Sequence, residues 1–263
     1  MRKYLFIIQQ SFQRALAYRA SFVLGLGVPL LQVAALYYFW TAVYAGATRP
    51  GGLSRHQMIT YLCVAFAVNQ LVGWGVETSI GRAIRDGSIA TELLKPLDYQ
   101  LYKLCEASGY MLLQGLLIAL LTFALAIWLL GIAVPATLVN LMLFLLSVAL
   151  GVLVAFSLSY VTGLAFFWTT NWWGLTQTKR WLVDMLSGAL VPLVFFPEWL
   201  RGIALALPFQ AIVHTPLTIY LGLLPEAGRL QALLAQLFWA VALWFAARLL
   251  FAQAIKRVTV QGG

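Results

Sequence analysis

The interval TSIGRAIRDGSIATELLKPLDYQLYKLCE, from Thr78 to Glu106, is the longest strongly charged part of the chain, and long apolar runs flank it on both sides. Its charged residues are Arg82, Arg85, Asp86, Glu92, Lys95, Asp98, Lys103 and Glu106. Because charged side chains are costly inside a bilayer, we expect this interval to lie in water beside a membrane and to join two membrane-spanning parts.

The spacing within this interval predicts a helix, a turn, a second short helix and a stop. Asp86-Gly87 is a turn signal, and Ser88 is the expected N-cap of the second helix. Pro96 disfavours helical backbone at the residue before it, and Asp98 can cap the helix that follows. Apolar residues recur four positions apart in both pieces, which gives each an apolar face: Ile80 with Ile84, and Ile89 with Leu93.

The composition of the whole chain predicts an all-α integral membrane protein. Of its 263 residues, 62% are hydrophobic and only 10% are charged, with a mean hydropathy of +0.89. Soluble domains carry about a quarter charged residues, so this chain lacks the polar surface to fold in water. The net charge of +9 comes from basic residues in short loops, which indicates membrane topology and contact with anionic headgroups rather than nucleic acid.

The pattern of apolar runs predicts one transmembrane domain, 1–263, with six spans. An N-terminal interfacial helix is expected at 1–19; a simple cytoplasmic extension of the first span is the alternative. The other expected parts are spans one and two in 20–76, the charged region in 77–106, spans three and four in 107–168, span five plus a re-entrant segment in 181–228, and the last span in 229–251.

Three local patterns refine this topology. The fourth run has small residues four positions apart, which would let a neighbouring helix approach closely: Gly151, Ala155, Ser159 and Gly163. Residues 168–181 combine tryptophans with Lys179 and Arg180, so we expect an interfacial loop there, followed by span five at 182–196. Proline-broken apolar pieces then predict a re-entrant hairpin marked by Pro192, Pro197, Glu198 and Pro208.

The basic residues decide the expected orientation. Of the 17 lysines and arginines, only Arg49, Arg55, Arg201 and Arg229 would lie outside if both termini were cytoplasmic. Cytoplasmic loops carry the excess of basic residues, so the charged interval is expected on the cytoplasmic side.

The sequence shows no catalytic, metal-binding or cofactor-binding motif. It has no GxxxxGK[ST] phosphate loop, no HExxH and no GxSxG. His56 and His214 have no obvious carboxylate partner, and Cys63 and Cys105 have no CxxC neighbour. No acidic residue is expected near the middle of the membrane, which argues against a proton-coupled carrier. Energy for any active process would then come from elsewhere, or the protein is passive.

Three blocks carry a resemblance to a known family. They are IRDGSIATELLKPLDYQLYKL at 84–104, SGALVPLVFFPEWLRGIALALPFQAIVHTPLTIYLG at 187–222, and SFQRALAYRASFVLG at 11–25. Together they resemble ABC-2-type exporter permeases, specifically the six-span group of similar length called DUF990. The resemblance implies a membrane subunit of an ATP-driven exporter in the bacterial cytoplasmic (inner) membrane. ATP and Mg would bind to cytoplasmic P-loop ATPase partners, with no cofactor in this chain. A second permease, of the same or a related chain, would complete the complex.

The resemblance also assigns roles to residues. The coupling helix, which docks on the ATPase in such permeases, would fall on 81–96, and the re-entrant extracellular helices on 197–208. The implied ATPase-coupling residues are Gly81, Arg82, Ile84, Arg85, Asp86, Gly87, Glu92, Leu93, Leu94, Lys95 and Pro96. The apparent lack of buried charge suggests an amphipathic or lipid-like substrate. A lipid-modifying membrane enzyme and a passive channel or scaffold subunit are the alternatives.

Overall fold

A computed structural model describes residues 2–17, 19–46, 50–72, 75–135, 137–169 and 172–257. Within these segments the chain forms helices and turns and no strand, so the all-α prediction is confirmed. The α-helices are α1 (Arg2–Ala17), α2 (Arg19–Ala45), α3 (Arg55–Asn69), α4 (Val76–Arg85), α5 (Ile89–Leu93), α6 (Tyr99–Tyr110), α7 (Leu116–Leu130), α8 (Leu138–Ala165), α9 (Trp172–Leu186), α10 (Glu198–Ala206), α11 (His214–Tyr220) and α12 (Glu226–Ala254). Short helical turns are η1 (Pro50–Gly52), η2 (Met111–Gly115), η3 (Leu193–Phe195), η4 (Pro208–Ala211) and η5 (Ile255–Arg257).

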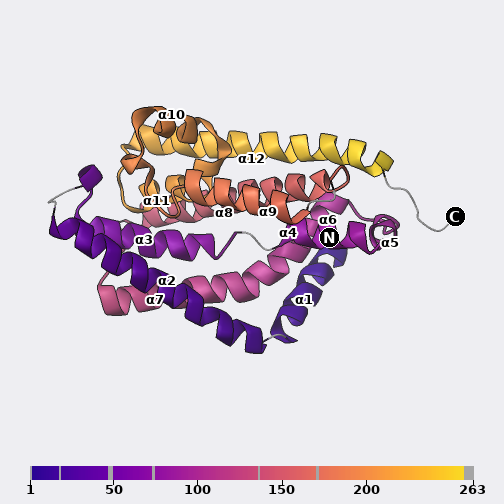
Figure 1. Cartoon of the computed structure of the whole chain (residues 1–263), viewed down its shortest axis with the longest axis horizontal. Coiled ribbons are helices and arrows are strands. Elements are labelled where there is room, and N and C mark those ends of the chain that lie inside the picture. Colours follow the sequence, from indigo (N-terminus) through magenta and orange to yellow (C-terminus); the bar gives the residue numbers. More distant parts are fainter. Residues whose placement is uncertain are drawn as a thin grey trace.

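The helices form an elongated bundle (Figure 1). α10 and α11 lie at one end, and α4, α5, the start of α1 and the end of α12 lie toward the other. Three helices in the described residues are long and apolar enough to cross a bilayer: Tyr99–Leu130, Leu138–Ala165 and Glu226–Arg257. At 1.5 Å per residue each exceeds the roughly 30 Å hydrocarbon core. The chain is therefore a membrane-embedded protein.

The centre of the bundle is built on α8, which packs along α12 (Figure 1). Gln236 in α12 fixes this contact because its Nε2 donates to the carbonyl oxygens of Ala211, at 2.6 Å, and Ser147, at 3.1 Å. The Ser147 hydroxyl donates back to Gln236 Oε1 at 2.7 Å. A buried hydrogen-bond network of this kind holds helices together in a membrane, where the hydrophobic effect does not drive helices toward one another.

The N-terminal helix α1 packs against α6, and a glycine permits the contact. A Cβ at Gly109 would lie 2.5 Å from Ser11 Cβ and 2.6 Å from the carbonyl oxygen of Ile8, so only glycine fits this approach. The predicted N-terminal helix is thus present with nearly the expected bounds. A helix also covers the first expected span, since α2 extends over Arg19–Ala45, and its crossing of the membrane stays a prediction.

The expectation of an interfacial loop at 168–181 is wrong, because α9 begins at Trp172 and continues to Leu186. Tryptophan and lysine indicate depth in a membrane, but neither breaks a helix, and α9 contains no proline. The helix ends where Gly188 adopts a φ of 81°, so the fifth apolar run, 182–196, is not one helix. The helix in this region therefore begins ten residues before the apolar run expected to form the fifth span.

The second expected span is also interrupted. α3 ends at Asn69, and α4 begins at Val76 after Gly75, whose φ is 64°. The helix preceding the charged interval is therefore shorter than expected. The charged interval itself begins on a separate helix, α4, which folds against α8.

Candidate functional site

The charged interval forms a helical hairpin, which we call the α4–α5 hairpin (residues 76–93). Its turn is the one predicted: Gly87 has a φ of 76°, and Asp86 Oδ1 accepts hydrogen bonds from the Ser88 hydroxyl, at 2.6 Å, and the Ser88 amide, at 3.0 Å. These bonds lower the pKa of the Asp86 carboxyl. Ser88 occupies the N-cap position of α5 as predicted, but its side chain makes no capping hydrogen bond, because its hydroxyl donates to Asp86.

The hairpin buries one face and exposes its tip. Ile80 and Ile89 are buried, as the four-residue spacing predicted. Gly81 lies against the Phe166 ring, since a Cβ there would be 2.8 Å from that ring. Of the other residues implied to couple to an ATPase, Ile84, Glu92 and Leu93 are half-buried, and the rest are exposed: Arg82, Arg85, Asp86, Gly87, Leu94, Lys95 and Pro96. Leu94 is 83% exposed, which is unusual for a leucine beside a charged turn.

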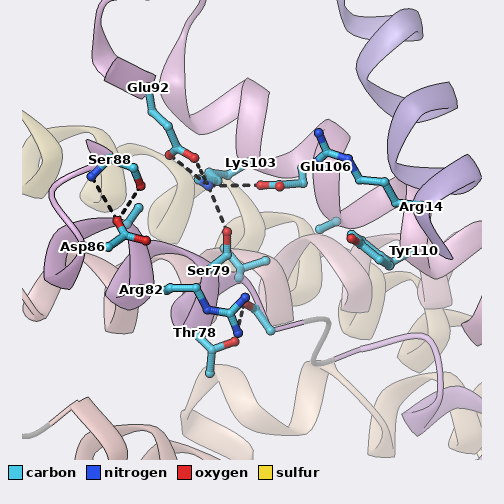
Figure 2. A pocket seen from close by; sticks show the side chains of 14 residues that line it. Arg14, Thr78, Ser79, Arg82, Asp86, Ser88, Glu92, Lys103, Glu106 and Tyr110 are labelled. Atoms are coloured by element: carbon cyan, nitrogen blue, oxygen red, sulfur yellow. Dashed lines mark hydrogen bonds and ion pairs between the residues drawn. The ribbon is translucent and has the colours of Figure 1, made fainter. Parts of the chain in front are cut away.

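A polar cavity of about 410 Å³ lies beneath the hairpin (Figure 2). α1, α4, α5 and α6 all contribute to its wall. Its labelled polar residues are Arg14, Thr78, Ser79, Arg82, Asp86, Ser88, Glu92, Lys103, Glu106 and Tyr110. Both acidic and basic side chains therefore line the cavity beneath the hairpin.

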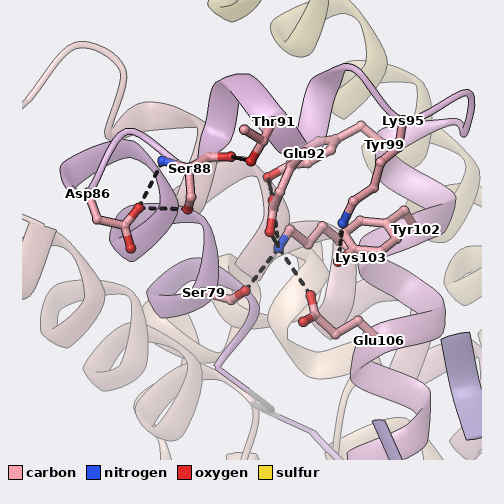
Figure 3. Close-up of polar contacts among 10 residues, drawn as sticks. All are labelled: Ser79, Asp86, Ser88, Thr91, Glu92, Lys95, Tyr99, Tyr102, Lys103 and Glu106. Atoms are coloured by element: carbon pink, nitrogen blue, oxygen red, sulfur yellow. Dashed lines mark hydrogen bonds and ion pairs between the residues drawn. The ribbon is translucent and has the colours of Figure 1, made fainter. Parts of the chain in front are cut away.

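Lys103 joins the hairpin to α6 (Figure 3). Its side chain is fully buried, and its Nζ lies 3.1 Å from Glu92 Oε2, 3.1 Å from Glu106 Oε2 and 3.0 Å from Ser79 Oγ. The Tyr99 hydroxyl donates to the same Glu92 carboxylate at 3.0 Å. Because Ser79 is in α4, Glu92 in α5 and Lys103 in α6, one ammonium group connects all three helices.

Asp98 makes a second junction at the start of α6. As predicted, it caps this helix, its Oδ1 accepting from the Leu101 amide at 2.9 Å. Its Oδ2 lies 3.0 Å from Arg248 Nη2 in α12, and its amide donates to the Tyr4 hydroxyl in α1 at 3.3 Å. The helix that follows the hairpin is thus tied to both α1 and α12.

α4 is also connected to α9, by a charge pair that the sequence did not reveal. Glu77 is only 4% exposed, and its Oε1 accepts from Lys179 Nζ at 2.7 Å. The same Nζ lies 3.0 Å from Ser159 Oγ in α8. The expectation that the chain buries no charge is therefore wrong. These partners are 102 residues apart, and no local pattern indicates that they meet.

The four small residues of α8 lie on its buried or half-buried side. A Cβ at Gly163 would approach Glu77 Cα at 3.1 Å, and one at Gly151 would approach the carbonyl oxygens of Ala211 and Ile212 at 3.0 Å. Ala155 and Ser159 between them are buried. This row thus faces α4 at one end and η4 at the other.

The prolines expected to mark a re-entrant segment stand at helix starts at the far end of the bundle. Pro192 precedes η3, Pro197 precedes α10 with Glu198 as its first residue, and Pro208 begins η4. The segment is held to the bundle because the Tyr61 hydroxyl donates to the Gly188 carbonyl at 2.9 Å. The His214 amide donates to the Ser187 carbonyl at the same distance.

The described residues contain no cluster of three or more histidine, cysteine and acidic side chains that could hold a metal ion. The hairpin thus has an exposed turn, and ion pairs join it to α6 and α9.

Comparison with known families agrees with this arrangement. A model of the ABC-2 family transporter proteins matches residues 30–262, which is most of the chain. The chain therefore belongs to the ABC-2 transporter family, and it is a membrane component of that class. The match covers the family as a whole, so membership of the DUF990 group stays a prediction. No curated protein matches the chain.

Proposed function

We propose that this chain is the permease subunit of an ATP-driven ABC-2 exporter and that the α4–α5 hairpin is where a separate P-loop ATPase docks. Family membership supports the general role. The observation that carries the docking site is the exposed turn of the hairpin at 85–87, together with Leu94, which follows α5 and is 83% exposed. Buried Lys103 joins the hairpin to a helix long enough to cross the membrane.

The proposed mechanism transmits movement rather than chemistry. ATP binding and hydrolysis in the partner would shift the hairpin tip, and Lys103 would carry that shift from α5 into α6. A partner favours one conformation only as far as it binds that conformation more tightly. In this scheme ATP and Mg bind to the partner alone, and the permease contributes no catalytic residue.

The proposed topology has six crossings, provided by α2, α3, α6 with α7, α8, α9 and α12. α1 would lie in the cytoplasmic interface, and η3 to α11 would form a re-entrant segment on the outside. Supporting this orientation, α4, α6 and the end of α12, which carry basic residues, lie toward one end of the bundle, and α10, which contains Arg201, lies at the other. The location would be the bacterial inner membrane, with both termini cytoplasmic, a second permease alongside, and an amphipathic substrate moved outward.

A charge swap at the hairpin tip tests the docking site. The double variant Arg85→Asp/Asp86→Arg keeps the net charge but reverses the pattern presented to a partner. The matched control, Glu198→Arg/Arg201→Asp, makes the same change on α10 at the opposite end. We expect purification of the tagged chain in mild detergent to recover a P-loop ATPase with the wild type and the control, but at least tenfold less with the tip variant.

Melting temperatures of all three proteins verify that the tip variant is folded. Equal ATPase recovery with the tip variant would refute docking at the hairpin. A wild-type protein that is stable and monodisperse with no ATPase would refute the exporter proposal and favour a passive channel, a scaffold or a lipid-modifying enzyme.

A further inference from the structure

A second cavity, of about 240 Å³, lies inside the bundle between α3, α4, α8, α9 and η4. It borders the cavity beneath the hairpin, since Gly75 and Thr78 line both. Its charged lining residues are Glu77, Lys179, Arg180 and Asp184, and its neutral polar ones include Asn69, Thr78, Ser159 and Thr176.

This cavity extends well into the part of the protein that crosses the membrane. Ala155 and Ile212 are among its lining residues. The Lys179 ammonium lies 3.0 Å from the Ser159 hydroxyl, and Ser159 is six residues, or about 9 Å, from the end of α8 at Ala165. Ionisable side chains at such depth are costly and are retained mainly where they serve a substrate or ion path.

The acidic groups of the cavity have unused hydrogen-bonding capacity. Glu77 is buried, and while its Oε1 binds Lys179, its Oε2 has no hydrogen-bond partner among the described residues. Asp184 takes part in none of the ion pairs found in the described segments. An ionised carboxylate only accepts hydrogen bonds, so the buried Oε2 of Glu77 lacks a donor, whereas water can reach the half-buried Asp184. Few buried polar atoms in native proteins lack a partner, so Oε2 of Glu77 needs an explanation, and a ligand or an ion is one.

The charges that line the cavity indicate which chemical class of ligand would fit it. Two acidic residues and two basic residues line the cavity, so its formal net charge is zero. A simple anion would leave Oε2 of Glu77 without a donor, and a simple cation would lie close to the positive charges of Lys179 and Arg180. A zwitterion satisfies both, with an ammonium group toward Glu77 and Asp184 and a phosphate toward Arg180, whose planar guanidinium suits phosphate oxygens.

The volume suggests how much of the ligand enters. Binding sites for whole small molecules occupy about 300–1,000 Å³, and this cavity is somewhat smaller. We propose that it binds the zwitterionic, phosphate-and-ammonium headgroup of an amphiphile that the transporter moves. This inference rests on the proposed exporter function and adds to it the chemical class of the substrate.

The position of Glu77 links this site to the hairpin. Glu77 lies in the first turn of the same helix, α4, whose other end carries the exposed turn at Asp86. Movement of the hairpin would change the distance between Glu77 and Lys179 in α9. The cavity would then have different affinities for the headgroup in the two conformations, which is what a transport cycle requires.

Binding to the purified full-length chain tests the proposal. Native mass spectrometry would be used to titrate three probes: lysophosphatidylethanolamine, which is zwitterionic, lysophosphatidylglycerol, which is anionic, and soluble glycerophosphoethanolamine. We expect about tenfold tighter binding of the zwitterionic lipid than of the anionic one, equivalent to one good charged hydrogen bond. Competition by the soluble zwitterion would show that the headgroup is recognised by itself; absence of competition would refute a headgroup site.

Two variants test the residues. Glu77→Gln/Lys179→Gln removes both partners of the pair and so leaves no unpaired buried charge. Arg180→Gln changes an exposed residue outside any ion pair in the described segments and carries little risk to folding. Each should abolish the tenfold preference, whereas the control Glu198→Gln/Arg201→Gln, which neutralises one acid and one base on α10, should keep it.

Each outcome separates this proposal from the exporter function. The inference would be overturned if the wild type bound the zwitterionic and anionic lipids with equal affinity. It would also be overturned if Arg180→Gln, or Glu77→Gln/Lys179→Gln with a normal melting temperature, kept the full preference for the zwitterionic lipid. Recovery of the ATPase is measured on the same samples. If the ATPase co-purifies but the preference is absent, only the headgroup site is wrong. If the preference is present but no ATPase is found, the exporter function is wrong.

Discussion

Replacement of Lys103 by methionine is the most direct test of how the hairpin is joined to the bundle. The side chain keeps its length and apolar stem but loses the ammonium group, which contacts Glu92, Glu106 and Ser79. Removing one partner of a buried ion pair costs about 3–5 kcal/mol because it leaves a buried charge unpaired. Here the two carboxylate side chains are still 18% and 20% exposed, so water offsets part of the cost. We expect a loss of about 2–3 kcal/mol.

The loss can be measured as a shift in melting temperature in detergent at a fixed scan rate. For chains of about this size, 1 kcal/mol corresponds to roughly 2–4 °C, so Lys103→Met should lower the melting temperature by about 4–12 °C. The matched control is Lys256→Met, at an exposed lysine of η5 that takes part in no ion pair in the described segments. That control should shift the melting temperature by less than about 2 °C.

A triple variant distinguishes the ion pair from simple packing. Lys103→Met/Glu92→Gln/Glu106→Gln removes the cation together with both carboxylates, so no charge is left without a partner. It should recover most of the stability lost in the single variant. The reasoning is refuted if Lys103→Met behaves like Lys256→Met, or if the triple variant is less stable than the single one.

Two further predictions concern α1 and the turn. Gly109→Val should push α1 away from α6, because even a Cβ at position 109 would overlap Ser11. The separation can be followed with Ser11→Cys in a chain whose native cysteines have been replaced, since this thiol should react faster with a thiol reagent when Gly109→Val is present. The control Gly202→Val, in open space on α10, should leave the reaction rate unchanged. Ser88→Ala should raise the pKa of Asp86 toward its ordinary value, since the hydroxyl hydrogen bond is the largest cause of the lowered pKa. Because the pKa of Asp86 is lowered in the folded state, the ionised carboxyl stabilises the fold at pH values above its unfolded pKa. This stabilisation disappears as the pH falls through the folded pKa, so in Ser88→Ala it is lost at a higher pH. Titration of the Asp86 carboxyl followed by ¹³C NMR measures this pKa, and an equal pKa in the wild type and in Ser88→Ala would contradict the prediction.

The hairpin could be predicted from the sequence because its signals are local. The turn depends on Asp86 and Gly87, and the stop depends on Pro96, all within a few residues of the backbone they shape. The long helices α2, α8 and α12 were predictable for a related reason, since a continuous apolar run leaves the backbone no alternative to internal hydrogen bonds in lipid.

The polar contacts could not be predicted in the same way. The pair between Glu77 and Lys179 depends on α4 folding back against α8 and on α9 being a helix, and neither is encoded near these residues. The sequence places Lys103 among charged neighbours, where exposure would be the ordinary expectation. It is buried because α5 folds over the start of α6 and brings Glu92 to it.

The arrangement of α4 explains why a displacement of the hairpin would not stay local. Ser79 and Glu77 are two residues apart on this helix, yet Ser79 accepts from Lys103 of α6 and Glu77 accepts from Lys179 of α9. The helix is separated from α3 by the break after Asn69, so α3 does not hold it in line. A ten-residue helix moves as a rigid unit about 15 Å long, and any shift of α4 must carry both α6 and α9 or break one of these bonds. Since Glu77 and Lys179 both line the inner cavity, the same shift changes the polar surface of that cavity. One short helix thus connects the proposed docking surface with the charged inner cavity.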